Sequence, residues 1–406
     1  MEFEYGLYRE DALIDKGSSV WEERLPLTRR FPALADAAAP VTFGMYFEAA
    51  RTFLEKEEIS RCMAAVSQKA GSVKGPLHIR NVRICLKKHG EFYHPAKVSL
   101  IGNRWVEPFV LNVAVSDFGK RILKRETRSL KRLQGLFPRP FVPRVHASGT
   151  VSTKAGEYGM LLGDWFEGYH EFHLYRDDQT HREGVCVWDD TRGAHLLSKK
   201  WEPTLYQNIA YILTFYYNPV TFEEVHPWHH AAGDFVLKVD TKRLQVRLVT
   251  VRDYRPMFHP LSDQEEKKAT SQAVLDALLL FFLNLSCRIR LDRESGTGEW
   301  VWADGECVGP ALVGFFLALG EKAPLSFLPA PLVDCFAAYM GAMSRKDVFE
   351  LLTALVIHRC RIKDEAAFVL KHLPAHADEL VSAFTSLMRT GEKNGNTRVP
   401  RRPVLS

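Results

Sequence analysis

The sequence has few cysteines, and they are scattered. Seven occur in 406 residues, and no two form a Cys-x-x-Cys pair. An odd number at wide spacing argues against a disulfide framework and against a structural zinc site. We therefore expect buried, reduced thiols and a cytoplasmic location.

The sequence also lacks the marks of export or membrane insertion. The first ten residues, MEFEYGLYRE, are acidic and contain no cationic region followed by an apolar core, as a secretory signal would. The most apolar stretch, Val274 to Leu285, is too short to span a bilayer. These absences predict a chain without an integral membrane segment.

The sequence has little excess of either sign of charge. Lysine and arginine number 54 and aspartate and glutamate 49, a difference of +5, which predicts no nucleic-acid partner. The basic residues that stand out are local, in Lys120 to Arg132 and in Arg398 to Arg402. With 46% apolar and 25% charged residues, the composition is that of a globular protein.

Changes in hydrophobic pattern predict four regions. Residues 1–74 form an N-terminal extension, irregular to about Ala39 and then an amphipathic helix from about Met45 to Val66. Residues 75–165 form a small lobe, and residues 166–389 form a larger helical lobe. Residues 390–406, rich in glycine, asparagine, arginine and proline, form a disordered tail.

Short β-prone runs and one helix predict an α+β fold for the small lobe. The strands are Val82 to Leu86, Lys97 to Ile101, Phe109 to Val115, Val142 to Ala147 and Tyr158 to Leu162, with a helix from Asp117 to about Leu133 after the third.

The second lobe begins with a predicted helix around Leu205 to Tyr217, followed by a hairpin of Phe235 to Val239 and Leu244 to Val251. Further helices are indicated by apolar periodicity. They are Val274 to Leu285, Pro310 to Leu319, Leu332 to Met343, Val348 to Ile357 and Ala366 to Met388.

Two polar residues lie on apolar faces of the small lobe. Asn112 shares one strand face with Val110 and Ala114. Glu126 is on the apolar face of the following helix, where a carboxylate needs a partner. One reading pairs Glu126 with a neighbouring arginine such as Arg125; the other gives it a role in a site.

Three segments together resemble the protein-kinase-like superfamily, in particular its bacterial branch of aminoglycoside-phosphotransferase-like and lipopolysaccharide-core sugar kinases. They are PFVLNVAVSDFGKRILKRE, YGMLLGDWFEGYHEFHL and EEVHPWHHAAGDFVLKVDTKRLQVRLVTVRDYRPMF. The resemblance covers about Val82 to Met257. It implies a two-lobed kinase-like fold, with a small N-lobe of antiparallel sheet plus one helix and a larger helical C-lobe.

The same resemblance implies an ATP-dependent phosphotransferase that uses ATP and Mg²⁺ on a small-molecule or sugar hydroxyl acceptor. The nucleotide and metal site would lie between Asn112 to Glu126 and His226 to Asp253. The segment YGMLLGDWFEGYHEFHL would provide the fifth strand and the connection between lobes, or else is an aromatic core with a turn at Gly168.

In the small lobe, Glu126 matches the family's helix glutamate, but Asn112 stands where the family has its phosphate-binding lysine. The hairpin of Leu86 to Gly102 would close over the phosphates, with Gly90 permitting close backbone approach or simply forming a turn. Lys88 or Lys97 is a candidate to supply the missing cation.

In the second lobe, the resemblance assigns Asp234 and Asp253 to magnesium. His229 falls where the family has its catalytic aspartate, and a histidine can act as a base near neutral pH. The structural alternatives are a cap or turn role for Asp234 and an ion pair of Asp253 with Arg252 or Arg255.

Three other functions stay open. Without its lysine and catalytic aspartate, the chain could be a degenerate kinase-like protein that binds nucleotide or a partner protein. The same residues could transfer a nucleotidyl group. His226, His229, His230 and Asp234 could instead bind a transition metal.

Overall fold

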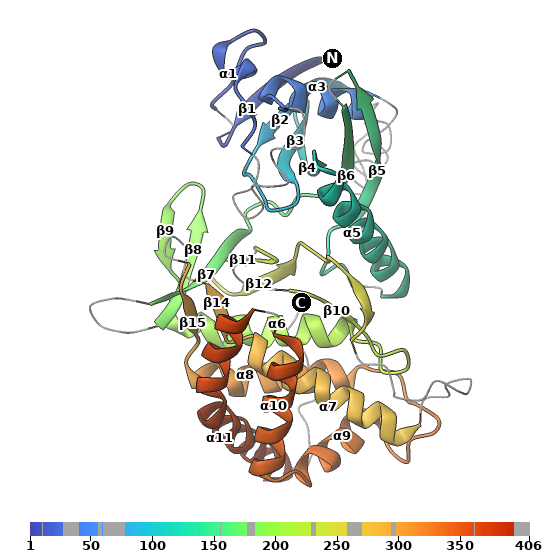
Figure 1. Ribbon diagram of the computed structural model, residues 1–406, viewed down its shortest axis with the longest axis vertical. Helices are drawn as coiled ribbons and strands as arrows, with labels where there is room; N and C mark the ends of the chain where they lie inside the picture. Colours follow the sequence, from blue (N-terminus) through green and yellow to red (C-terminus); the bar gives the residue numbers. More distant parts are fainter. Residues whose placement is uncertain are drawn as a thin grey trace. The chain divides into compact units, whose positions relative to one another are not determined.

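The chain folds into two compact units, Met1–Glu167 and Gly168–Ser406, each of mixed α+β structure (Figure 1). The computed structural model describes residues 1–9, 11–26, 40–55, 59, 78–137, 139–154, 156–176, 183–228, 233–257, 270–293, 298–360 and 362–393, with side chains to residue 390. Each unit is described by itself below.

Unit 1 is built on a six-stranded sheet in the order β1-β2-β3-β4-β6-β5. The strands β2 to β4 form an antiparallel meander, the helix α5 follows, and β5 and β6 form a hairpin whose second strand pairs with β4. Their bounds are β1 Glu2–Leu7, β2 Ile79–Leu86, β3 His94–Gly102, β4 Val106–Ala114, α5 Asp117–Leu136, β5 Val145–Thr153 and β6 Gly156–Asp164.

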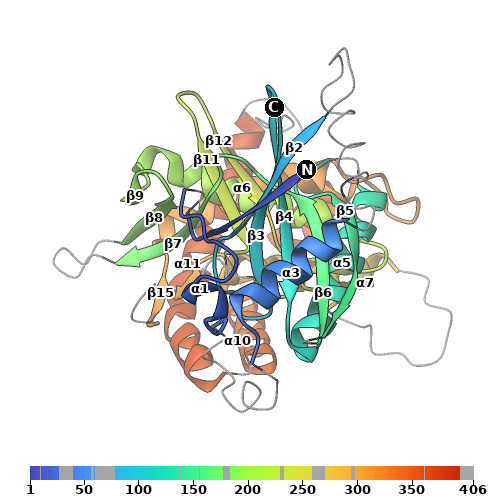
Figure 2. The same ribbon diagram turned by 90° about the horizontal axis from the view of Figure 1, so that it is seen from above.

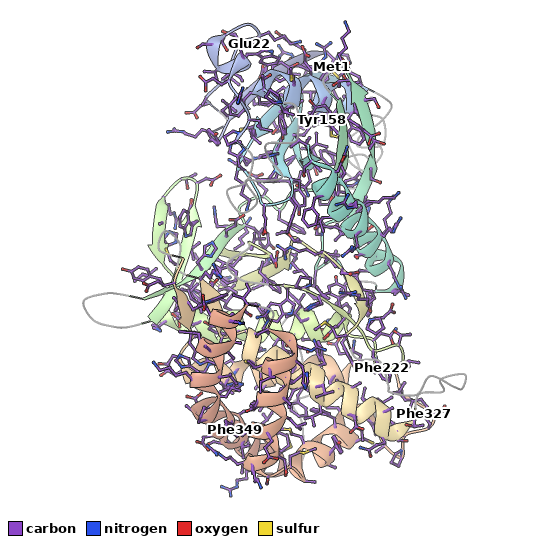
Figure 3. All side chains as sticks on the ribbon, viewed as in Figure 1. Met1, Glu22, Tyr158, Phe222, Phe327 and Phe349 are labelled. Atoms are coloured by element: carbon purple, nitrogen blue, oxygen red, sulfur yellow. The ribbon has the colours of Figure 1, made fainter. Side chains whose placement is uncertain are left out.

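The helix α3 (Phe43–Phe53) covers one face of this sheet, and Figure 2 shows it crossing β4, β6 and β5. Alternate strand residues point to this face and are fully buried, such as Phe109, Leu111 and Val113 on β4. Tyr158 on β6, labelled in Figure 3, belongs to the same core. The helix α5 packs on β4, β5 and β6 beside Ala114 and Gly159, residues of the opposite face.

The N-terminal segment corrects one prediction. The first 39 residues were expected to be irregular, but Glu2–Leu7 forms the strand β1, which pairs in parallel with β2. The sheet of unit 1 is therefore mixed and not purely antiparallel. Tyr5 on β1 is buried against Trp21, which belongs to the short helix α1 (Ser19–Glu22). The helix α3 was predicted to extend to Val66, and residues 60–77 lie outside the described part.

Unit 2 also contains a substantial sheet, with five antiparallel strands in the order β12-β11-β7-β8-β9. The aromatic segment predicted to connect the lobes becomes β7, because Phe172 and Leu174 alternate with polar residues and are buried. A short pair, β10 and β13, flanks the β11–β12 hairpin. The bounds are β7 His170–Arg176, β8 Glu183–Asp189, β9 Gly193–Leu196, β10 Glu223–Val225, β11 Phe235–Val239, β12 Leu244–Leu248 and β13 Tyr254–Pro256.

The helices of unit 2 agree with the predicted apolar periodicities. They are α6 Glu202–Tyr216, α7 Ser271–Arg288, α8 Val308–Gly320, α9 Leu332–Gly341, α10 Arg345–Arg359 and α11 Lys363–Lys393, and a hairpin of β14 Leu291–Arg293 and β15 Trp300–Trp302 follows α7. The helix α6 packs along α8, and α8 contacts α11. The helix α11 continues to Lys393, past the predicted start of the tail at residue 390, and the rest of the predicted tail lies outside the described residues.

Among the described helices, α7 is the one long and apolar enough by composition to cross a membrane. It is 18 residues long, and 56% of it is buried. It contacts α8, α9 and α10, and Phe282 packs against Phe315 and Phe336. These contacts are those of a core helix.

Candidate functional site

In unit 1, Asn112 and Lys97 lie on the same face of the sheet. Asn112 pairs across strands with Pro95 on β3, and Lys97, two residues farther along β3, pairs with Val110. Cross-strand partners share a face, so both polar residues lie opposite the α3 core. Asn112 is 9% and Lys97 8% exposed.

Lys97 is held by two residues that follow β6. Its Nζ lies 3.0 Å from Oε2 of Glu167 and 5.5 Å from the centre of the Trp165 ring. The Glu167 side chain is 65% exposed, against 10% for Lys97. The cation is thus buried on the sheet, while its carboxylate partner is largely exposed to solvent. Of the two lysines that the sequence offered, Lys97 is on the strand, and Lys88 is exposed in the β2–β3 loop.

Glu126 is completely buried in α5, on the inward face that the sequence predicted. Its Oε2 accepts a hydrogen bond of 2.9 Å from the Tyr93 hydroxyl. Tyr93 belongs to the loop between β2 and β3, so this carboxylate fastens the predicted phosphate-covering loop to the helix. Sequence reasoning offered Arg125 or a site lysine as the partner and missed Tyr93, because the loop's packing is a tertiary contact.

The β2–β3 loop is also constrained from within. The Gly90 amide donates to the Tyr93 carbonyl at 3.1 Å, and a Cβ on Gly90 would lie 2.6 Å from that oxygen. Glycine is therefore required by the turn itself. The Nδ1 atoms of His89 and His94 are hydrogen-bonded at 3.1 Å. Burial lowers the pKa of His94 to about 3. His94 is thus a neutral hydrogen-bonding residue.

In unit 2, Asp234 is completely buried just before β11. Its Oδ2 accepts a 2.6 Å hydrogen bond from Nη1 of Arg252. Its backbone carbonyl accepts from the Val249 amide at 2.7 Å. These contacts hold Asp234 beside Val249, the residue after β12, and against Arg252, which directly precedes Asp253 in the sequence.

Asp253 lies between β12 and β13. Its Oδ1 accepts from the Tyr254 amide at 3.0 Å, and its Oδ2 lies 3.2 Å from Nε of Arg255. The Asp253 carbonyl accepts from the His226 amide at 3.1 Å. Pairing of β10 with β13 therefore brings three residues to one end of the β11–β12 hairpin. They are His226, Asp234 and Asp253.

His229, the candidate base, and His230 lie outside the described residues, as do residues 231 and 232. Within the described part of the chain, no group of three or more His, Cys, Asp or Glu side chains is arranged to hold a metal ion. The transition-metal alternative therefore gains no support from His226 and Asp234 alone.

The two aspartates have the donor chemistry for Mg²⁺, a hard cation that prefers carboxylate oxygens. Each, however, is also bound by an arginine, Arg252 or Arg255. The two carboxylates and two guanidinium groups sum to zero formal charge. Asp234 and Asp253 would hold the cation, and the arginines would compete with it.

A third carboxylate near this position was missed. A Cβ built on Gly233 would lie 3.0 Å from Oε1 of Glu171, which places that side chain beside the Gly233 to Asp234 turn. Glu171 is on β7, opposite Val236 of β11. The alternation of polar and apolar residues in HEFHL was the sequence signal that could have placed Glu171 on a strand.

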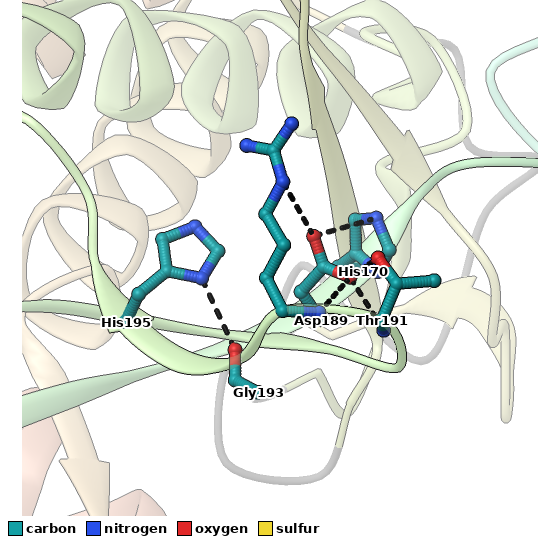
Figure 4. A network of polar contacts seen from close by, with 6 residues as sticks. His170, Asp189, Thr191, Gly193 and His195 are labelled. Atoms are coloured by element: carbon teal, nitrogen blue, oxygen red, sulfur yellow. Dashed lines mark hydrogen bonds and ion pairs between the residues drawn. The ribbon is translucent and has the colours of Figure 1, made fainter.

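A second polar network in unit 2 is a turn, not a site (Figure 4). Asp189 at the end of β8 accepts from the Thr191 hydroxyl at 2.7 Å, the Thr191 amide at 2.8 Å and the Arg192 amide at 3.1 Å. Thr191's hydroxyl hydrogen bond is the largest of the causes that hold the pKa of Asp189 far below its usual range. These bonds fix the β8–β9 turn.

No protein-family model matches the chain, and comparison with curated proteins gives no match.

Proposed function

We propose that this chain is an ATP-dependent phosphotransferase of the protein-kinase-like class, acting on a small-molecule or sugar hydroxyl. The observation that carries the proposal is the convergence in unit 2. His226, Asp234 and Asp253 meet at one end of the β11–β12 hairpin. Phosphoryl transfer needs oxygen ligands for magnesium and a proton acceptor in such an arrangement.

Unit 1 supports the proposal through its element order. A three-strand meander, a helix with a buried glutamate and a two-strand hairpin follow in the sequence expected from the resemblance. The family has a phosphate-binding lysine at the position of Asn112. In this proposal Lys97 takes the place of that lysine, because it presents a buried cation on the same face of the sheet. Glu126 acts indirectly, through Tyr93 and the β2–β3 loop.

The experiment is a thermal shift with ATP and Mg²⁺, followed by measurement of label released from the γ and the α positions of ATP. Phosphotransfer predicts a shift and γ release. Release from the α position would indicate nucleotidyl transfer instead. Asp253→Asn should abolish release, and Asp240→Asn is the matched control because Asp240 lies in the turn of the same hairpin, paired with Arg243.

A second candidate is a catalytically silent kinase-like protein that binds nucleotide. The observation that favours it is the arginine on each candidate metal ligand, at 2.6 Å for Asp234 and 3.2 Å for Asp253. Arginine binds phosphate oxygens well, so Arg252 and Arg255 could take over the charge neutralisation that Mg²⁺ supplies in an enzyme.

Replacing Arg252 separates the two candidates. In a silent protein, ATP binding is independent of Mg²⁺, and Arg252→Gln weakens it. In an enzyme, ATP binding requires Mg²⁺, and Arg252→Gln lowers the Mg²⁺ concentration that it requires because Asp234 loses its competing cation. Arg243→Gln, in the turn of the same hairpin, is the control and should leave ATP binding unchanged.

A further inference from the structure

The helix α5 has two sharply different faces. Its buried residues include Leu123, Glu126, Leu130 and Leu133, which point into unit 1. Six cations are exposed on the other side. They are Arg121, Lys124, Arg125, Arg128, Lys131 and Arg132. At 3.6 residues per turn these six span roughly 120° of the helix circumference, centred opposite the buried face.

Three of these cations form no ion pair with a described carboxylate. In the described part of the chain, no carboxylate forms an ion pair with Arg121, Lys124 or Arg128. The exposed acidic residue of α5, Asp117, is paired with Lys120, which is not one of the six, and interacts more weakly with Arg121. The chain's charge is nearly balanced overall, so this face is a local concentration of positive charge.

Two apolar residues are exposed at the ends of the same helix. Phe118 is 37% and Leu136 51% exposed. They are 18 residues apart, which is five helical turns, so both lie along one edge of the cationic face, roughly 27 Å apart. A broad helix face of cations, with an apolar residue at each end of one edge, matches a flat partner with a charged surface and an accessible apolar layer.

We propose that this face of α5 is a docking surface for an anionic phospholipid bilayer. Lysine and arginine attract acidic headgroups, and Phe118 and Leu136 can enter the headgroup boundary. Nucleic acid offers the negative charge but no apolar layer for Leu136. The helix is already folded against the sheet, so docking requires no ordering of the chain. The inference is independent of the proposed function, since Glu126 lies on the opposite face.

Vesicle co-sedimentation tests the proposal with the full-length protein. The vesicles are phosphatidylcholine alone, or phosphatidylcholine with about 30% phosphatidylserine. The protein should bind the anionic vesicles only, and less as salt is raised. Arg121→Gln, Lys124→Gln and Arg128→Gln combined should weaken binding on the order of a hundredfold. Arg192→Gln, Lys242→Gln and Lys346→Gln combined, with the same charge change on unit 2, should not weaken it.

Two further measurements keep the proposal falsifiable. Phe118→Ser with Leu136→Ser should weaken vesicle binding without any change in charge, and circular dichroism should show that every variant is folded. Equal binding to neutral vesicles, no binding to either vesicle, or an equal loss in the unit 2 control would overturn the proposal. So would tighter binding to duplex DNA that the Phe118 and Leu136 changes leave unaltered, since that would assign the face to nucleic acid.

Discussion

Glu126 shows how a single buried carboxylate can organise a loop. The side chain is fully buried, and the cost of removing it from water must be offset by hydrogen bonds. The Tyr93 hydroxyl supplies one of them and so fixes the β2–β3 loop on α5. In the proposed enzyme this loop covers the nucleotide phosphates, and the position of Glu126 would affect activity through it.

Removing that hydrogen bond should be measurable. Tyr93→Phe leaves a buried carboxylate without its hydroxyl donor, and we expect a loss of about 2 kcal/mol in the free energy of unfolding. Urea denaturation measures it. Tyr8→Phe is the matched control, because its hydroxyl hydrogen bond to His89 is exposed and should contribute less than about 0.5 kcal/mol. Equal effects of the two changes would contradict the role given to Tyr93.

Glu224 is a second buried carboxylate, on β10 beside the candidate site. Its nearest cationic group is Nη1 of Arg359, 3.9 Å from Oε1, and no hydrogen bond reaches Oε1. Burial raises its pKa from 4.5 to about 8, although Arg359 acts in the opposite direction. Tyr217 also lies near Glu224, and burial raises the pKa of Tyr217 well above its usual value.

The raised pKa of Glu224 predicts a pH-dependent stability. The folded chain binds this proton more tightly than the unfolded chain, so the stabilisation is complete below pH 4.5 and is lost as pH rises toward 8. The slope can reach about 1.4 kcal/mol per pH unit. Urea midpoints at pH 5 and pH 8 should differ less in Glu224→Gln than in the wild type. An unchanged difference would contradict the assignment, and the exposed Glu350→Gln is the control.

At the scale of elements, the strands and helices with regular apolar periods were predictable. The meander β2 to β4, α5, the β11–β12 hairpin and α6 to α11 lie close to their predicted positions because burial on one face imposes a visible period. The strands β1, β7, β8 and β9 and the short strands β10, β13, β14 and β15 were missed. The strand β1 pairs with a strand more than 70 residues away, and β7 follows a turn rich in aromatics. For the site, the inward position of Glu126 was predictable, whereas its contact with Tyr93 and the arginine on Asp234 depend on tertiary packing.

The strand β1 should therefore contribute to stability. The Tyr5 ring packs against Trp21 and Phe47 at centroid distances of 5.1 and 5.2 Å and is 4% exposed. Tyr5→Ala should lower the free energy of unfolding by about 3 kcal/mol, as for other buried aromatics. Tyr8→Ala, at a position that is 46% exposed, is the control. If Tyr5→Ala had no effect in urea denaturation, an irregular N-terminal segment would be the better description.

At the scale of the whole molecule, the candidate residues are divided between the units. Asn112, Lys97 and Glu126 belong to unit 1, and Asp234 and Asp253 belong to unit 2. The proposal assigns the phosphates to the first group and magnesium to the second. Unit 2 holds its carboxylates through arginines, so the account requires that nucleotide with Mg²⁺ compete successfully with those ion pairs.

Isothermal titration with ATP, with and without Mg²⁺, tests this claim most directly. The wild type should bind ATP with Mg²⁺, and Lys97→Met and Asp253→Asn should each weaken that binding by about tenfold or more, since each removes a charge that in the proposed site contacts phosphate or metal. Lys242→Met and Asp240→Asn should leave it unchanged. No heat of binding for the wild type, or wild-type affinity in Lys97→Met and in Asp253→Asn, would contradict the kinase-like account.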